Sequence, residues 1–192
     1  MCFAAVVRKV SIASLLGATT IITMTMITPS SKAESSPQLK VNDPAPLFTV
    51  KTFEGKDFSL ADRKGQWTVL YFYPKAGTPG CTKQACSFRD NLEKIKSLGA
   101  EVYGISADTV AEQAEFHKKE HLNFILLADP DDQVVNMYGS KMPMLKMSKR
   151  WTFIIDPSLK IRSIAKDVDP VLDSQRVAQE IAEMQKKDQS KK

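Results

Sequence analysis

The sequence YFYPKAGTPGCTKQACSFRD, residues 71–90, begins with the end of an apolar segment. A turn that contains Pro and Gly follows, and two cysteines come after the turn. The segment that it continues, residues 67–73 (WTVLYFY), is β-branched and aromatic throughout, which is typical of a strand buried on both faces. After the turn, apolar side chains at helical spacing predict a helix over residues 80–98, with its apolar face at Phe88, Leu92, Ile95 and Leu98. The central feature is therefore a buried strand leading into a helix that carries both cysteines near its start.

The rest of the chain alternates between expected strands and helices. Strands are expected at residues 47–53, 57–60, 101–107, 124–128, 151–156 and 161–165. Helices are expected at residues 108–121, capped by Asp108 or Thr109, and at residues 132–138 and 171–184. This alternation, closed by a hairpin and a helix, predicts one α/β domain with a mixed sheet. The domain is expected at residues 43–186, between a linker at 34–42 and a flexible tail at 187–192.

Length and charge limit the classes of protein to which the chain can belong. Its 192 residues, 43% hydrophobic and 26% charged, suffice for one well-buried domain and are few for two. The formal net charge is +5, but residues 1–33 hold three basic residues and no acidic ones. Without them, 24 basic and 22 acidic residues leave a net charge of +2. This small surplus, with no cluster of basic and aromatic residues, argues against a nucleic-acid partner.

Residues 1–33 are expected to be a signal peptide. Arg8 and Lys9 form a positive start, residues 10–27 are apolar and Thr-rich without a charge, and residues 31–33 (SKA) suit a cleavage site. An uncleaved membrane anchor is the alternative, because an apolar run of about 18 residues reaches the lower limit for spanning a bilayer. We therefore expect an exported protein, in the periplasm or another extracytoplasmic compartment, or one anchored to the membrane by this segment.

The two cysteines occupy different positions on the predicted helix. Cys81 follows Gly80 in the first turn, where unpaired N–H groups and the helix dipole favour a thiolate nucleophile. Cys86 comes five residues later, and ideal helix geometry separates the two Cα atoms by about 8.5 Å. Because a disulfide needs them within about 7 Å, a permanent bridge would forbid the helix. A disulfide that forms and breaks during turnover would require only local unwinding.

Two other uses of the cysteine pair stay open from the residues alone. A structural disulfide suits an exported protein, although the helix geometry opposes it. Zinc would need two more ligands, and the chain has no second cysteine pair. His117 and His121 form HKKEH, which formally matches an H-x-x-E-H metal motif. The dense charge around them favours a solvated helix with surface histidines instead.

At this point the chain resembles a known family. The segment PKAGTPGCTKQACSFRD, residues 74–90, resembles the active-site segment of the peroxiredoxins, specifically of the bacterioferritin comigratory protein or peroxiredoxin Q subfamily. A second segment, RWTFIIDPSLKIR at residues 150–162, is similar to the family's later motif, in which an Arg precedes a strand ending in Ile-Asp-Pro. The resemblance covers roughly residues 41–184, and two motifs in the right order make it specific.

The resemblance implies a thioredoxin-like fold, with a central mixed β-sheet flanked by helices, and the reduction of hydroperoxides by a cysteine. By position, Cys81 would be the peroxidatic nucleophile and Cys86 the resolving cysteine. Thr78 would hydrogen-bond the peroxide and the thiolate, Pro74 would shield the sulfur, and Arg150 would supply positive charge. The thiolate would become a sulfenic acid and then a Cys81–Cys86 disulfide, and this chemistry requires no metal, flavin or haem.

The expected substrates are hydrogen peroxide and organic hydroperoxides, and the expected reductant is a thioredoxin-like protein. One alternative is a non-peroxidase thiol–disulfide oxidoreductase or redox-sensing module on the same fold, although such proteins usually carry C-x-x-C. Another is a disulfide-stapled binding domain. We expect a monomer that contacts a membrane only if residues 1–33 stay attached. The Met-rich segment 139–149 either shapes substrate choice or closes a loop, and the sequence leaves both open.

Overall fold

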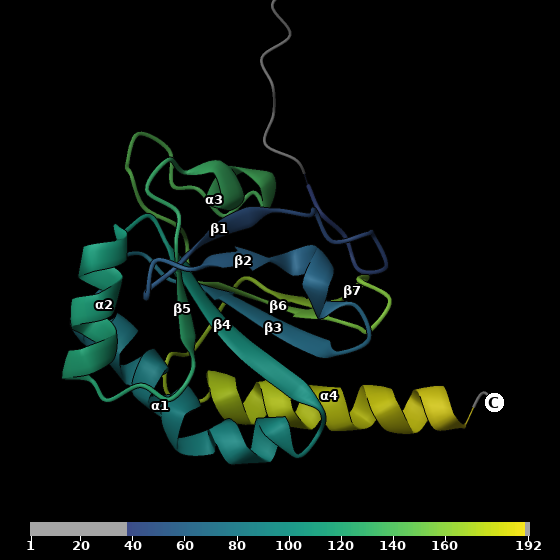
Figure 1. Cartoon of the computed structure of the whole chain (residues 1–192). Coiled ribbons are helices and arrows are strands. Elements are labelled where there is room, and N and C mark those ends of the chain that lie inside the picture. The colour runs from purple at the N-terminus through teal and green to yellow at the C-terminus, as the bar shows by residue number, and fades with distance from the viewer. Residues whose placement is uncertain (1–37, 191–192) are drawn as a thin grey trace, which may run out of the picture. The chain divides into compact units, whose positions relative to one another are not determined.

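The strand expected at the start of the central stretch lies inside a mixed sheet. The computed structural model describes residues 38–190, and its seven strands have the order β2-β1-β5-β4-β3-β6-β7 (Figure 1). β3 (Trp67–Phe72) pairs in parallel with β4 (Ala100–Ser106), which in turn pairs in parallel with β5 (Ile125–Ala128). On its other side, β3 pairs in antiparallel fashion with β6 (Trp151–Ile155). The predicted α/β domain with a mixed sheet is confirmed.

The edges of the sheet are antiparallel. β1 (Thr49–Thr52) pairs with β5 and with β2 (Asp57–Ser59), and a short 3-10 helix at Leu60–Arg63 follows β2. At the other edge, β7 (Ile161–Ala165) forms the expected hairpin with β6.

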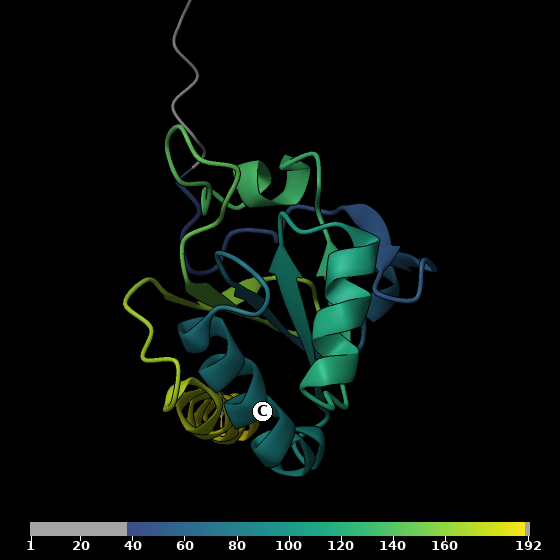
Figure 2. The ribbon, with the colours of Figure 1, turned by 90° about the vertical axis from the view of Figure 1, so that its left-hand side faces the viewer.

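Helices cover both faces of this sheet. α1 (Pro79–Lys96), α2 (Val110–Lys119) and α4 (Asp173–Gln189) lie on one side, and α3 (Gln133–Met137) lies on the other, as Figure 2 shows. Two separate cores fill the space between the sheet and these layers.

β3 explains why its sequence is apolar at every position. Successive side chains of a strand point to opposite faces of the sheet. Val69 and Tyr71 accordingly belong to the core beneath α1, whereas Leu70 and Phe72 belong to the core beneath α3. All six residues of the strand are buried. The strand therefore forms a rigid base for the loop that follows it.

The last helix is longer than expected, and residues 187–189 of the expected tail belong to it. α4 continues to Gln189 instead of ending near residue 184. Polar contacts rather than apolar burial hold its last turns: the guanidinium of Arg162 donates to both carboxylate oxygens of Asp188, at 3.0 and 3.1 Å. Gln185 also donates to the carbonyl of Leu98 at 2.7 Å. Apolar periodicity alone could not reveal contacts of this kind.

The expected linker is partly built into the domain. Asn42 donates its backbone N–H to the carbonyl of Ile161 at 2.7 Å, and the N–H of Ile161 donates to the carbonyl of Asp43 at 2.9 Å. The end of the linker is therefore held against the start of β7. The predicted signal peptide or anchor at residues 1–33 lies outside the described residues. Within residues 38–190, no helix is both long and apolar enough to cross a membrane.

Candidate active site

The first turn of α1 holds Cys81 at the end of the loop after β3. Thr78 is the N-cap residue, with extended backbone angles, and Pro79 takes the first helical position, where its missing N–H costs nothing. Cys81 therefore sits among the unpaired N–H groups of the first turn, as predicted. Its side chain is only 1% exposed and packs into the core that contains Tyr71 and Tyr73.

Arg150 reaches Cys81 because of the way in which two strands pair. Antiparallel pairing sets Phe72 opposite Trp151, so the residue before β6 lies beside the end of β3. From there, Nη2 of Arg150 donates to Sγ of Cys81 at 3.5 Å. A Cβ at Gly80 would meet this Nη2 at 3.2 Å, so the guanidinium packs closely over the helix start. The structure thus brings two predicted site residues together across 69 positions of sequence.

Two residues that the sequence did not single out complete the surroundings of Arg150. Nη1 of Arg150 donates to Oε1 of Gln84 at 2.6 Å, and Nε2 of Gln84 donates to Oδ2 of Asp173 at 2.8 Å. The position of Gln84, one helical turn after Cys81, was the available signal, because residues three apart share a helix face. Asp173 had no such signal in the sequence, because it comes close to Gln84 only when α4 docks on α1.

Cys86 lies on the same unbroken helix as Cys81, and both are free thiols. It is half-buried, and burial raises the pKa of the Cys86 thiol, while the nearby Arg89 guanidinium offsets part of that rise. Arg89 is itself fixed by donating to the backbone carbonyl of Glu120 at 2.7 Å. With α1 continuous from Pro79 to Lys96, a disulfide between the two cysteines requires local opening of the helix.

Thr78 and Pro74 both lie on the loop that leads to Cys81, half-buried. The hydroxyl of Thr78 donates to the carbonyl of Lys75 at 3.0 Å, so in this state it stabilises the loop rather than contacting the sulfur. Pro74 follows Tyr73 directly, at the point where the chain leaves the sheet. The structure thus places both residues on the short loop that ends at the first turn of α1.

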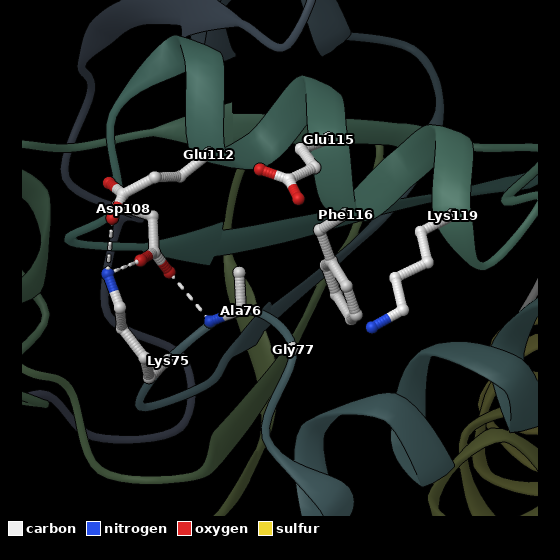
Figure 3. Close-up of a pocket in the computed structure, with 8 residues that line it drawn as sticks. All are labelled: Lys75, Ala76, Gly77, Asp108, Glu112, Glu115, Phe116 and Lys119. Atoms are coloured by element: carbon white, nitrogen blue, oxygen red, sulfur yellow. Dashed lines mark hydrogen bonds and ion pairs between the residues drawn. The ribbon is translucent and has the colours of Figure 1, made fainter.

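A buried carboxylate holds the loop between Pro74 and Thr78. The N–H of Ala76 donates to Oδ2 of Asp108 at 2.8 Å, and Lys75 forms ion pairs with Asp108 and Glu112 (Figure 3). The bond from Lys75, with two more from Thr109, lowers the pKa of Glu112 to about 2. Asp108 was one of two expected caps of α2. The cap is Thr109, in a capping box with Glu112, and Asp108 instead fixes the loop.

A cavity of about 220 Å³ lies between this loop and α2 (Figure 3). The cavity is lined by residues of the loop, by one aromatic side chain and by several charged side chains. These residues are Lys75, Ala76, Gly77, Asp108, Glu112, Glu115, Phe116 and Lys119. Neither cysteine belongs to this lining, so the cavity borders the candidate site without containing the sulfur.

The Met-rich segment, residues 139–149, forms a loop that is hydrogen-bonded within itself and to the residue that directly follows β3. Met142 donates its N–H to the carbonyl of Met147 at 2.9 Å, and the tip of the loop exposes Met144 completely. At its end, the buried hydroxyl of Ser148 donates to the carbonyl of Tyr73 at 2.8 Å. Ser148 therefore links the segment just before Arg150 to the residue just before Pro74.

The two histidines have different surroundings. The ring of His117 stacks on Phe53, with 3.8 Å between the ring centroids, and it is half-buried. His121 is exposed and lies past the end of α2 with a left-handed backbone angle, φ 50°. Among residues 38–190, no group of three or more His, Cys, Asp or Glu side chains is arranged to hold a metal ion.

Comparisons with known proteins match most of the described domain to one family. The AhpC/TSA family matches residues 41–164. Peroxiredoxin Bcp of Escherichia coli K12 is 42% identical over 135 residues, which cover 67% of this chain and 86% of that protein. The crystal structure of peroxidoxin BcpB from Mycobacterium tuberculosis superposes with a TM-score of 0.71 at 30% identity, covering 76% of this chain and 97% of the other. A structure of the bacterioferritin comigratory protein from Xanthomonas campestris shares the fold, with a TM-score of 0.69 at 24% identity over 74% of this chain and 99% of that one.

Proposed function

This chain belongs to the AhpC/TSA family, in the branch of the Bcp and Q peroxiredoxins, and on that premise we propose that Cys81 and Cys86 carry its peroxidase activity. The protein is a thiol-dependent peroxidase with a thioredoxin-like fold. One observation supports the assignment of Cys81 above all: its sulfur lies in the first turn of α1, with the Arg150 guanidinium at 3.5 Å. Among the described residues, no guanidinium donates a hydrogen bond to the Cys86 sulfur, and Arg89 acts on that thiol through its charge.

The first step is nucleophilic attack by sulfur on oxygen. The Cys81 thiolate forms an S–O bond to one oxygen of the hydroperoxide, and the O–O bond breaks as its electron pair leaves with the other oxygen. That oxygen departs as water or an alcohol after it takes up a proton, and Cys81 is left as a sulfenic acid. Arg150 is placed to stabilise negative charge on the sulfur and on the oxygens as the bond breaks.

The second step uses Cys86. Its sulfur attacks the sulfenic sulfur, an S–S bond forms, and the oxygen leaves as water. Because both cysteines lie on one helix, α1 must unwind locally before the sulfurs can meet. We assign reduction of the disulfide to a thioredoxin-like dithiol, which would attack it through a mixed disulfide and regenerate both thiols.

Thr78 and Pro74 are assigned supporting roles. A rotation of the Thr78 hydroxyl away from the carbonyl of Lys75 would let it donate to a bound peroxide, since a hydroxyl proton can turn to suit its acceptor. Pro74 has no N–H to offer, and its ring would cover the approach to the sulfur. Hydrogen peroxide and organic hydroperoxides are the proposed substrates.

The compartment of the protein is also a proposal. The charged start, the apolar run and the small residues at 31–33 support export after cleavage, with a membrane-anchored protein as the alternative. The domain at residues 43–186 would then work outside the cytoplasm as a monomer, and its reductant would have to be supplied there.

A thiol titration with one equivalent of hydrogen peroxide tests the proposed function. The reduced protein should lose both thiols of the Cys81–Cys86 pair for each equivalent added, without a change in mass other than the loss of two hydrogens. A thiol–disulfide oxidoreductase that is not a peroxidase would keep both thiols after one equivalent of peroxide is added, but it would reduce insulin disulfides. A protein in which the two cysteines form a permanent structural disulfide would show no free thiols of this pair before peroxide is added. Either of these two results would overturn the proposal.

A further inference from the structure

Asp173 has no part in the steps above, yet a continuous chain of hydrogen bonds joins it to the reactive sulfur. The chain runs from Cys81 through the guanidinium of Arg150 and the amide of Gln84 to the carboxylate of Asp173. Gln84 is fully buried and Asp173 is only 2% exposed. Neither side chain can therefore exchange these partners for bulk water.

Asp173, at the end of this series of hydrogen bonds, determines which groups donate and which accept along it. An ionised carboxylate only accepts hydrogen bonds, whereas an amide has one end that accepts and one that donates. Asp173 therefore takes the NH₂ end of Gln84, which leaves the oxygen end facing Arg150. Arg150 can only donate, so this is the one orientation of the amide that satisfies it.

Asp173 is held in place by other donors. Nη2 of Arg176 donates to its Oδ1 at 2.6 Å, and the hydroxyl of Thr152 donates to its Oδ2 at 2.7 Å. Thr152 lies on β6, and Arg150 directly precedes this strand, so the same segment positions both the guanidinium and a donor to the carboxylate. The carboxylate thus has a fixed place relative to the guanidinium.

We propose that Asp173 is a positioning residue for the peroxide reaction: it fixes the orientation of the Gln84 amide and thereby holds Arg150 against the Cys81 sulfur. The proposal rests on the assigned role of Cys81. The carboxylate of Asp173 contacts Gln84, Thr152 and Arg176 rather than the sulfur, and it acts through the amide of Gln84. If the amide turned over, its NH₂ group would face the guanidinium, two donors would oppose each other, and Arg150 would leave the sulfur.

The first test is Asp173→Asn. Arg176 carries a charge and should take the oxygen of the introduced amide, since charge-assisted hydrogen bonds are the stronger ones. The NH₂ end of that introduced amide would then face Gln84 and turn it over. The second-order rate constant for oxidation of Cys81 by hydrogen peroxide, measured by stopped flow under single-turnover conditions, should fall roughly tenfold or more, as expected for an unpaired buried donor.

A charge exchange separates this role from general damage. Gln84→Glu alone places two buried carboxylates in contact and should also slow the reaction roughly tenfold. The double variant, Gln84→Glu with Asp173→Asn, restores an acceptor for Arg150 and gives the introduced carboxylate a donor. Its rate constant should return to within about threefold of the unchanged protein, because the two changes are directly coupled.

Ser174→Ala is the matched control. Ser174 is the neighbour of Asp173, is equally buried, and contacts Ser87 and Asn91 on α1, at 2.7 and 3.1 Å. Loss of these hydrogen bonds should lower the melting temperature, but the rate constant should not change, because Thr152 and Arg176 still hold the carboxylate of Asp173.

Two results would overturn the positioning role: a double variant as slow as Gln84→Glu, or an Asp173→Asn variant as fast as the unchanged protein. If the Asp173→Asn variant does not fold, the comparison of the double variant with Gln84→Glu still tests whether Asp173 is a positioning residue. Failure of the unchanged protein to react with peroxide would overturn the proposed function instead.

Discussion

Replacement of Cys81 by Ser should abolish the consumption of hydrogen peroxide. A serine hydroxyl stays protonated at neutral pH and does not attack an O–O bond, whereas every other part of the site would remain in place. Loss of a nucleophile typically costs more than about a thousandfold in rate, so the residual rate should not exceed that of added reductant alone. Stopped-flow measurement of peroxide loss, with dithiothreitol as the reductant, provides the comparison.

Cys86→Ser is the matched control for this experiment. It removes the second sulfur from the same helix but leaves Cys81 and Arg150 in contact. This variant should consume one equivalent of peroxide at the rate of the unchanged protein. If Cys81→Ser and the unchanged protein consumed peroxide equally fast in a single turnover, Cys81 would not be the nucleophile.

Oxidation should open the first part of α1. The two Cα atoms lie about 8.5 Å apart on an ideal helix, and a disulfide draws them to less than about 7 Å, so hydrogen bonds of the helix must break. Amide hydrogens of residues 82–87 should exchange about a hundredfold faster, or more, in the disulfide form than in the reduced form. Hydrogen-exchange mass spectrometry on the two redox forms measures this change.

Contacts between α1 and α4 should limit how far the opening spreads. The hydroxyl of Ser87 donates to the carbonyl of Val171 at 2.7 Å, and the side chains of Phe88 and Leu92 are buried in the core. The amides from Leu92 onward should therefore keep the same exchange rates in both forms. Slower exchange at residues 82–87 after oxidation would identify a stabilising staple and contradict a catalytic disulfide.

Local patterns in the sequence were sufficient to predict the frame of the site. The apolar run of β3 and the helical spacing after it fixed where the helix would begin, and this placed Cys81 in the first turn. The position of Cys86 on the same helix, and hence the need for unwinding, also followed from spacing alone. Arg150 was predicted only through a family resemblance, because its contact with Cys81 depends on the pairing of β3 with β6.

The contacts that position these residues could not be predicted. Asp173 meets Gln84 across 89 positions of sequence, and Asp108 meets Ala76 across 32. Each contact exists only after strands pair and helices dock, and a single acidic residue at a helix start looks like a cap. The C-terminal turns of α4 were missed for a related reason: the ion pair between Arg162 and Asp188 has no periodic pattern.

The most direct measurement is the site of oxidation in Cys86→Ser after one equivalent of hydrogen peroxide. The variant should be treated with dimedone, which forms a stable adduct with sulfenic acids, and then digested and analysed by mass spectrometry. We expect one adduct per chain, located on Cys81, and none in a parallel sample of Cys81→Ser. An adduct on Cys86 in Cys81→Ser, with Cys81 unmodified in Cys86→Ser, would contradict the assignment of Cys81 as the residue that attacks the peroxide.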